Sequence, residues 1–367
     1  MPRRGPLDAV IDGSAWDAFC EELKRAGRMV IDAAPDDPFD RAEGLRYVGR
    51  IARHGLDSFI ERSDPAASVV TPGLPKIGGD NPDYLYASAP LSNAHEYRIT
   101  GEVGDARMVG IGSYDGDVGT DAGLTLCDYL STPGLDVDEH GRFEIAVSER
   151  EQPGSWLRIG PATTQLMTRQ TLLDRRSDRP ASFSIERTDG GAPATPLDPL
   201  RYATQLERAG QYVSGAIDQF LRWTERFATR PNEVRPLDPD LAAGAQGDPS
   251  THYYGGYFEL APDQALVIDF VPPSCDYWNL QLCNHWLESL DYDHHVVHVN
   301  DHTARLDARG CARIVVCDRD PGHPNWLDTA GHRRGGIFLR QIGTTAPDDP
   351  VCRVTAIESV GAVPPRA

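Results

Sequence analysis

Short runs of alternating apolar and polar residues, separated by Gly, Asp and Pro, constrain the fold of this chain most. Between residues 80 and 190 they include HEYRITGEV, ARMVGIGSY, RFEIAVSE, SWLRIG, TTQLMTRQTL and SFSIERT. Eight more follow from residue 251, among them DYWNLQLCNHW, HHVVHVN and CARIVVCD. Alternation with a period of two places one face of a strand in a core. We therefore expect two antiparallel β-sandwiches, the second with the strand count of a jelly roll.

Helical patterns precede and separate these runs. Apolar residues recur at helical spacing over 14–30, 39–61 and 198–229, and Pro231 stops the last of these helices. The predicted fold class is mainly β with helical additions (α+β). The expected domains are an N-terminal helical region (1–70), a first β-sandwich (71–197), a bridging helix and linker (198–250) and a C-terminal jelly-roll-like β-sandwich (251–367). No internal repeat stands out in the sequence.

Charge and composition exclude some partners. A formal net charge of −19 argues against binding to nucleic acid or to an anionic membrane surface. No stretch of 18 apolar residues and no signal peptide is evident, and the seven cysteines form no CxxC pair. These features predict a cytoplasmic protein with reduced thiols. They leave homo-oligomer formation open.

The acidic stretch DDPFD, with Asp36, Asp37 and Asp40, matches the aspartate-rich pattern that terpene cyclases use to hold magnesium and diphosphate. Such short matches arise easily in a chain with 55 acidic residues. An aspartate that caps the following helix explains the same letters. Both interpretations remain open at this point.

Two loops carry polar and aromatic side chains of the kind found in binding sites. In GGDNPDYLYASAPL these are Asn81, Asp83, Tyr84 and Tyr86; the alternative is a turn closed by Asn81 and Asp83 with packed tyrosines. The second loop, DPGHPNWLDTAGH, contains Trp326, Asp328 and His332. His332 could be a base oriented by Asp328, or the loop could be a rigid structural element held by Trp326.

Histidines gather in LDYDHHVVHVNDH, at His294, His295, His298 and His302. Read as a strand, this segment separates His294 from His298 by about 13 Å, too far for one metal ion. The neighbouring strand is the better candidate. There a polar row that includes Tyr277 and Asn279 shares one face with His285, and Trp278 and Leu280 take the apolar face.

Together, the segments NPDYLY, DYWNLQL and DPGHPNWLDTAGH resemble proteins built from the paired domains of unknown function 1254 and 1214. The resemblance is strongest over residues 251–344. In the N-terminal half, Asn81, Asp83 and Tyr86 match the N-x-D-x-x-Y pattern of that family, with Tyr84 where Thr is usual. The resemblance implies an N-terminal β-sandwich followed by a jelly-roll-like domain, and it supplies no catalytic mechanism.

The sequence thus predicts a soluble bacterial enzyme acting on a small organic metabolite, anionic or hydroxylated, in a cleft between two β-domains. The chemistry expected is acid/base catalysis without a metal or cofactor. Predicted catalytic residues are His285, His332 and Asp83. Predicted substrate-binding residues are Asn81, Tyr84, Tyr86, Tyr277, Asn279, Trp326 and Arg340. The alternatives are a non-catalytic protein that binds a small molecule or carbohydrate and, more remotely, magnesium-dependent diphosphate chemistry at Asp36, Asp37 and Asp40.

Overall fold

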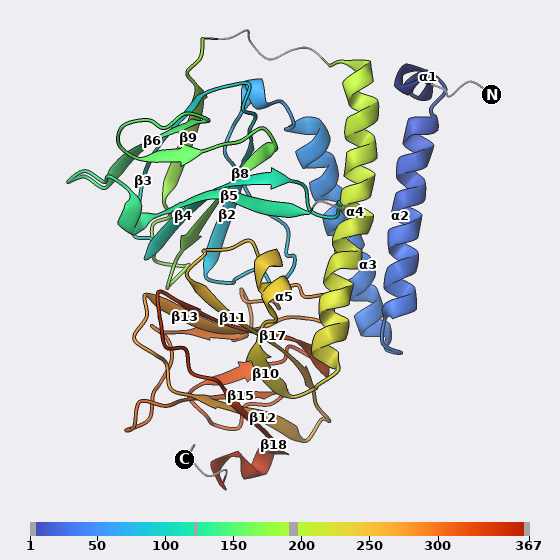
Figure 1. Cartoon of the computed structure of the whole chain (residues 1–367). Helices are drawn as coiled ribbons and strands as arrows, with labels where there is room; N and C mark the ends of the chain where they lie inside the picture. Colours follow the sequence, from blue (N-terminus) through green and yellow to red (C-terminus); the bar gives the residue numbers. More distant parts are fainter. Residues whose placement is uncertain (1–4, 121–122, 191–196, 363–367) are drawn as a thin grey trace. The chain divides into compact units, whose positions relative to one another are not determined.

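The computed structural model describes residues 5–120, 123–190 and 197–362. They form two compact units. Unit 1 comprises Met1–Pro75 and Asp83–Gln219, and unit 2 comprises Lys76–Pro82 and Phe220–Ala367. Each unit contains one β-sandwich (Figure 1). The predicted fold class, mainly β with helical additions and two β-domains, is confirmed.

Helices cover part of unit 1. They are α1 (Pro6–Ile11), α2 (Ser14–Ala33), α3 (Pro38–Leu56), which continues into the π-helical turn η1 (Asp57–Glu61), and α4 (Pro199–Ala228), of which unit 1 holds the residues up to Gln219. Figure 1 shows α2, α3 and α4 side by side. Their apolar stripes are buried at Phe19, Val30, Ile51, Leu206 and Val213, as the helical spacing predicts.

The sandwich of unit 1 packs a five-stranded sheet, in the order β1-β2-β8-β4-β5, on a four-stranded sheet, β7-β6-β3-β9. Its core includes Ile99, Ile111, Ile145 and Leu166. The strand bounds are β1 Thr71–Pro72, β2 Tyr84–Pro90, β3 Tyr97–Glu102, β4 Met108–Gly116, β5 Leu124–Ser131, β6 Arg142–Ser148, β7 Trp156–Arg158, β8 Thr163–Thr171 and β9 Ser182–Arg187. Two short 3-10 turns, η2 (Pro65–Ala67) and η3 (Thr132–Gly134), complete the unit.

The sandwich of unit 2 packs the sheet β10-β11-β17-β13-β14 on the sheet β16-β15-β12-β18. Its core includes Phe270, Trp278, Leu280, Ile314 and Leu339. The elements are β10 Glu233–Pro236, α5 Pro239–Gly244, β11 Thr251–Glu259, β12 Gln264–Phe270, β13 Tyr277–Leu282, β14 His298–Asn300, β15 Ala312–Cys317, β16 Trp326–Asp328, β17 Arg334–Ile342, β18 Val351–Ala356 and the 3-10 helix η4 Ile357–Ala362.

The two sandwiches have the same topology. Each strand of unit 2 takes the sheet position of the strand nine places earlier in the chain, and the parallel pair β6–β7 recurs as β15–β16. Even a detail repeats: the indole Nε1 of Trp156 donates to the Ser148 carbonyl at 3.2 Å, and that of Trp326 donates to the Cys317 carbonyl at 3.0 Å. The expectation of no internal repeat is therefore wrong for the structure. Cores accept exchange among apolar residues, so a fold can repeat without visible sequence repetition.

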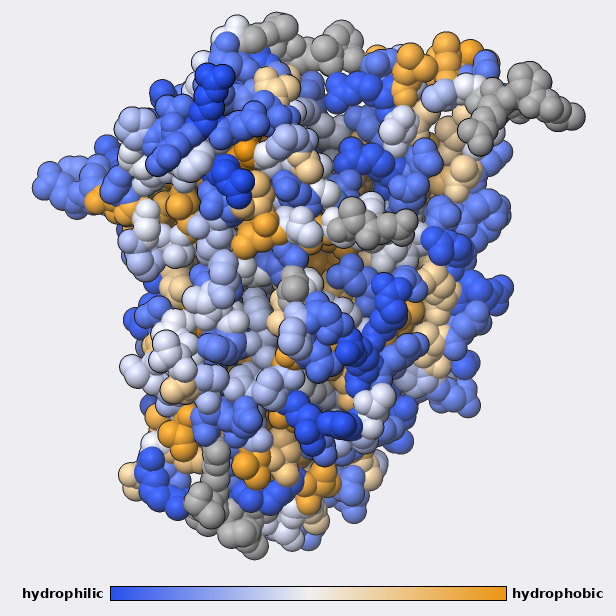
Figure 2. Space-filling model, in the orientation of Figure 1, coloured by the Kyte–Doolittle hydropathy of each residue, from blue (hydrophilic) through white to orange (hydrophobic). Residues whose placement is uncertain are grey.

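Hydrophilic residues cover most of the face drawn in Figure 2, and hydrophobic residues appear in small separate patches. No helix within the described ranges is long and apolar enough to cross a membrane. All seven cysteines are free thiols.

Candidate functional site

Arg169 is the buried charge around which unit 1 builds its most unusual cluster. It lies in β8, the central strand of the five-stranded sheet, opposite Tyr86 in β2 and Gly110 in β4. Leu166 points into the core, so the alternation of the strand turns Arg169 to the outer face of the sheet. Arg169 is nevertheless only 8% exposed. A guanidinium stays charged at any physiological pH, so its burial must be compensated.

Tyrosines surround this guanidinium. Arg169 Nη1 donates to the Tyr114 hydroxyl at 2.5 Å, and its guanidinium carbon lies 5.6 Å from the Tyr114 ring centroid and 5.9 Å from that of Tyr86. The Tyr84 ring lies 5.8 Å from the Tyr86 ring. Burial opposes the charge of Arg169, but Tyr114, Tyr129 and Tyr86 more than offset it and raise its pKa. The outer face thus places the Arg169 charge among aromatic rings and phenolic hydroxyl groups.

Two glycines of β4 make room for the aromatic rings. A Cβ at Gly110 would lie 1.8 Å from the Tyr129 hydroxyl oxygen, and one at Gly112 would lie 2.7 Å from the Tyr114 ring. Tyr114 follows Gly110 and Gly112 with a period of two in β4, so its side chain lies on the same outer face of the sheet. The register of β4 against β5 shifts beside it, where Cys127 is an extra residue of β5. The sequence MVGIGSYDG therefore lets the rings lie against the strand backbone beside Arg169.

Unit 2 repeats the tyrosine–arginine pair of this row. Arg340 lies in its central strand, β17, opposite Tyr253 in β11 and Asn279 in β13. Arg340 is 7% exposed. Its Nη1 donates to Gln281 Oε1 at 2.6 Å, and its Nη2 donates to the Gly79 carbonyl oxygen. A buried arginine beside a tyrosine thus occurs at the same position of both sandwiches.

The segment Lys76–Pro82 occupies the outer face of this sheet in unit 2. Gln281 Nε2 donates to the Asp80 carbonyl at 2.7 Å. Asn81 Nδ2 donates to the Tyr277 hydroxyl at 3.0 Å, and Asn279 Nδ2 donates to Asn81 Oδ1 at 3.0 Å. The chain itself therefore provides partners for Arg340 and for the side-chain amide groups of Asn279 and Gln281, except for the buried Asn279 Oδ1, which has none among the described residues.

Lys76 and Asp80 of this segment are also held by hydrogen bonds. Lys76 Nζ donates to the Ser289 and Leu290 carbonyls at 2.8 Å, and the Ser289 hydroxyl donates to Asp80 Oδ2 at 2.6 Å. Burial raises the pKa of Asp80, although Ser289, Lys76 and Arg340 act in the opposite direction. In unit 2 the predicted ligand-binding residues Asn81, Tyr277, Asn279 and Arg340 thus bind one another and their own chain.

His285 does not lie on the predicted polar strand face. Strand β13 ends at Leu282, and His285 lies in the turn that follows, where Leu287 adopts a left-handed φ of 57°. Its Nδ1 is 2.6 Å from the Tyr257 hydroxyl, and its ring lies 4.9 Å from that of Trp286. The imidazole and phenol are placed to share a proton. Burial raises the pKa of the nearby Cys283 thiol to about 12, so this thiol is not a nucleophile at neutral pH.

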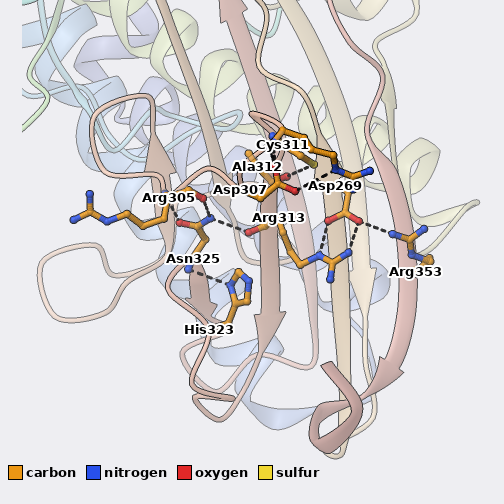
Figure 3. A network of polar contacts seen from close by, with 10 residues as sticks. Asp269, Arg305, Asp307, Cys311, Ala312, Arg313, His323, Asn325 and Arg353 are labelled. Atoms are coloured by element: carbon orange, nitrogen blue, oxygen red, sulfur yellow. Dashed lines mark hydrogen bonds and ion pairs between the residues drawn. The ribbon is translucent and has the colours of Figure 1, made fainter. Parts of the chain in front are cut away.

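The predicted Trp326–His332 loop begins with strand β16 (Trp326–Asp328), which pairs with β15 at the edge of the other sheet of unit 2. Trp326 lies against Val315 and Cys317 of β15. Asn325 fastens the loop: its Nδ2 donates to the Arg305 and Arg313 carbonyls at 2.7 and 2.9 Å (Figure 3). These contacts are those of a rigid loop, although the proposed binding role of Trp326 itself stays a prediction.

The expected partnership between Asp328 and His332 is not formed. Asp328 Oδ2 instead lies 2.8 Å from His295 Nδ1. Buried His332 has its own Nδ1 2.8 Å from the Thr329 carbonyl oxygen. The imidazole therefore helps to close its own loop, and a catalytic role for His332 stays a prediction.

The predicted site residues belong to both units. Asp83, Tyr84 and Tyr86 belong to unit 1, and Tyr84 and Tyr86 join the Arg169 cluster. Asp83 is buried, and its carbonyl accepts the Leu172 N–H at 2.8 Å; its catalytic role stays a prediction. Sequence reasoning missed Arg169, Tyr114 and Tyr129. A signal existed: Arg169-Gln170 recurs as Arg340-Gln341 at the end of the equivalent strand.

Most of the histidine-rich segment LDYDHHVVHVNDH lies outside strands. Only His298–Asn300 is strand, because the preceding residues turn: His295 N donates to the Asp291 carbonyl, and His294 pairs with Asp291 at 2.9 Å. The strand predicted over 294–300 is therefore too long. Within the described ranges, no three His, Cys, Asp or Glu side chains are grouped to hold a metal ion.

In DDPFD, Asp37 caps α3 by accepting from Phe39 N at 2.8 Å, so the helix-cap interpretation of this aspartate is confirmed. Exposed Asp36 pairs with Arg41 at 3.3 Å, and Asp40 is buried in α3.

Comparisons with known proteins give one strong similarity. No protein-family model and no curated protein matches the chain. The solved structure of an uncharacterized protein from Burkholderia cenocepacia is 40% identical in sequence, with a TM-score of 0.93 over 96% of this chain and 100% of that chain. A Vibrio parahaemolyticus protein is 13% identical, with a TM-score of 0.48 over 90% of this chain and 98% of that chain.

Proposed function

This chain belongs to the same family as the uncharacterized Burkholderia cenocepacia protein, and we propose that it binds a small organic anion at Arg169 on the outer face of the unit 1 sheet. The observation that supports this most is the buried Arg169 guanidinium among Tyr86, Tyr114 and Tyr129. An anionic ligand would accept a charge-assisted hydrogen bond from this guanidinium. The tyrosines would supply hydroxyl groups and ring faces.

The reaction we propose is metal-independent acid/base chemistry by Tyr114. A phenol has an acidic proton as well as an acceptor oxygen, and this oxygen of Tyr114 accepts a hydrogen bond from Arg169. A ligand oxygen held at Arg169 would lie within reach of that proton. The alternative is a binding protein that uses the same residues without turnover. His285 with Tyr257 is the second acid/base pair, supported by their 2.6 Å contact in unit 2.

Family assignment beyond the Burkholderia protein is also a proposal. We propose that the chain is a divergent relative of proteins with the paired domains of unknown function 1254 and 1214. Two tandem sandwiches agree with the arrangement that this resemblance implies. The family gives no activity, so the proposed function depends on the Arg169 cluster alone.

Isothermal titration tests binding. The full chain is titrated with acetate, benzoate and glucose, and the measurement is repeated on Arg169→Gln. Arg98→Gln is the control, because Arg98 is a half-exposed arginine whose ion pairs lie on the other sheet of the same unit. We expect a carboxylate to bind the wild type and Arg98→Gln but not Arg169→Gln. Binding of glucose alone, or carboxylate binding that survives Arg169→Gln, would overturn the proposal.

Turnover needs a separate experiment. A metabolite extract is incubated with the wild type or with Tyr114→Phe, and organic acids are followed by mass spectrometry. The enzyme interpretation expects at least one acid to be consumed by the wild type and spared by Tyr114→Phe. If the wild type consumes none but retains one, the protein binds its ligand without turnover. The Phe variant keeps the ring and removes only the hydroxyl, so its fold should be preserved.

A further inference from the structure

The equivalent face of unit 2 indicates what kind of group the Arg169 face takes. In both units a tyrosine and an arginine lie opposite each other on neighbouring strands: Tyr86 and Arg169 in unit 1, Tyr253 and Arg340 in unit 2. In unit 2 the arginine binds the Gly79 carbonyl oxygen. A planar group with an sp² oxygen thus occupies the position above the buried arginine.

The peptide backbone that carries this oxygen is flat as well. Gly79 lies on the Phe338 ring, so closely that a Cβ would be 2.4 Å from a ring carbon. Phe338 belongs to the same strand as Arg340 and lies opposite Gln281 and Gly255. The Gly79 carbonyl oxygen therefore lies on Arg340, and the thin, flat Gly79 backbone lies over Phe338, two residues before Arg340 in the strand.

Unit 1 has matching parts. Met167 takes the strand position of Phe338, two residues before Arg169 and opposite Gly112 and Ser88. Methionine sulfur makes favourable contacts with aromatic rings. Tyr84 and Tyr86, which are partly exposed, add ring faces beside the guanidinium. The face therefore combines a guanidinium with a wall suited to a flat, unsaturated ligand.

We infer that the Arg169 face takes a planar carboxylate carried on an aromatic ring, with its oxygens on Arg169 and its ring between Met167 and the tyrosines. This inference rests on the proposed function, that Arg169 binds an organic anion. The guanidinium fork matches a carboxylate in geometry and charge. The ring adds stacking and sulfur–aromatic contacts that a saturated ring of the same size makes less well.

A ligand series on the unmodified full chain tests the inference. Benzoate, cyclohexanecarboxylate, acetate and inorganic phosphate are compared by isothermal titration. We expect benzoate to bind tightest, by roughly 2-fold to 12-fold over cyclohexanecarboxylate, the range that corresponds to one aromatic contact. Acetate or cyclohexanecarboxylate binding as tightly as benzoate would overturn the aromatic inference and leave the proposed function standing. Tightest binding of phosphate would overturn it too. No binding by any carboxylate would overturn both.

A matched pair of variants locates the ring. Met167→Ala should weaken benzoate by about 3-fold or more and leave acetate unchanged, because acetate reaches only the guanidinium. Met29→Ala is the control, since Met29 lies in α2. An equal loss of acetate and benzoate affinity in Met167→Ala, or no loss of either, would contradict the placement of the ring.

Discussion

Arg169 and Arg340 occupy the same position in two sandwiches of one chain. Each lies in the central strand of a five-stranded sheet, opposite a tyrosine, and each is more than nine-tenths buried. Their surroundings differ. Arg340 is held by Gln281 and by the Lys76–Pro82 segment, whereas Arg169 is surrounded by tyrosines. The repeated position with changed partners is the basis for proposing that one face is structural and the other binds a ligand.

Gly110→Ala should impair the Arg169 cluster while costing little stability. The new Cβ would lie 1.8 Å from the Tyr129 hydroxyl, so this partly exposed ring must move away. We expect carboxylate affinity to fall about tenfold and the free energy of unfolding to change by about 1 kcal/mol or less. Titration and urea denaturation measure the two effects. Gly49→Ala is the control: it lies in α3 with open space around it, so affinity should not change.

Gly79→Ala should destabilise unit 2. Gly79 has a φ of +75° and lies against the Phe338 ring, so alanine adds both backbone strain and a steric clash. We expect a loss of about 2–4 kcal/mol in the free energy of unfolding. Gly73→Ala separates the two causes, because Gly73 has a φ of +98° and no atom within 4 Å of the added Cβ. It should cost only about 1–2 kcal/mol. Equal losses of unfolding free energy in the two variants would show that the contact between Gly79 and the Phe338 ring is not tight.

His54 should make the protein less stable as the pH falls. Burial against Tyr212 lowers the pKa of His54 from 6.5 to about 4. The unfolded chain therefore takes up a proton near pH 6.5, and the folded protein does so only near pH 4. Stability is lost through this window by up to about 3 kcal/mol. In His54→Gln, this part of the pH dependence should vanish. Urea denaturation at several pH values measures it, and an unchanged slope in the variant would refute the assignment.

Period-two alternation and helical spacing were enough to predict two sandwiches and the long helices, because burial of one face dictates those patterns. The repeat was hidden, since equivalent core positions hold different apolar residues.

The candidate site depended on contacts that local patterns do not encode. Gly110 and Gly112 read as strand residues, yet they admit the rings beside Arg169. His285 lies outside its predicted strand because the strand ends at Leu282 and the chain then turns, with Leu287 in a left-handed conformation. Arg340 was predicted as a site residue, but no local sequence pattern indicates that its guanidinium binds the Gly79 carbonyl oxygen.

The proposed function requires Arg169 to hold the carboxylate of a small organic ligand. A crystal structure of the full chain saturated with benzoate tests it most directly. We expect density for the carboxylate at hydrogen-bond distance, about 2.7–2.9 Å, from the Arg169 guanidinium, with the Arg340 guanidinium still bonded to the Gly79 carbonyl oxygen. Density for benzoate at another place in the molecule, or an Arg169 face empty of ligand at a saturating concentration, would contradict it.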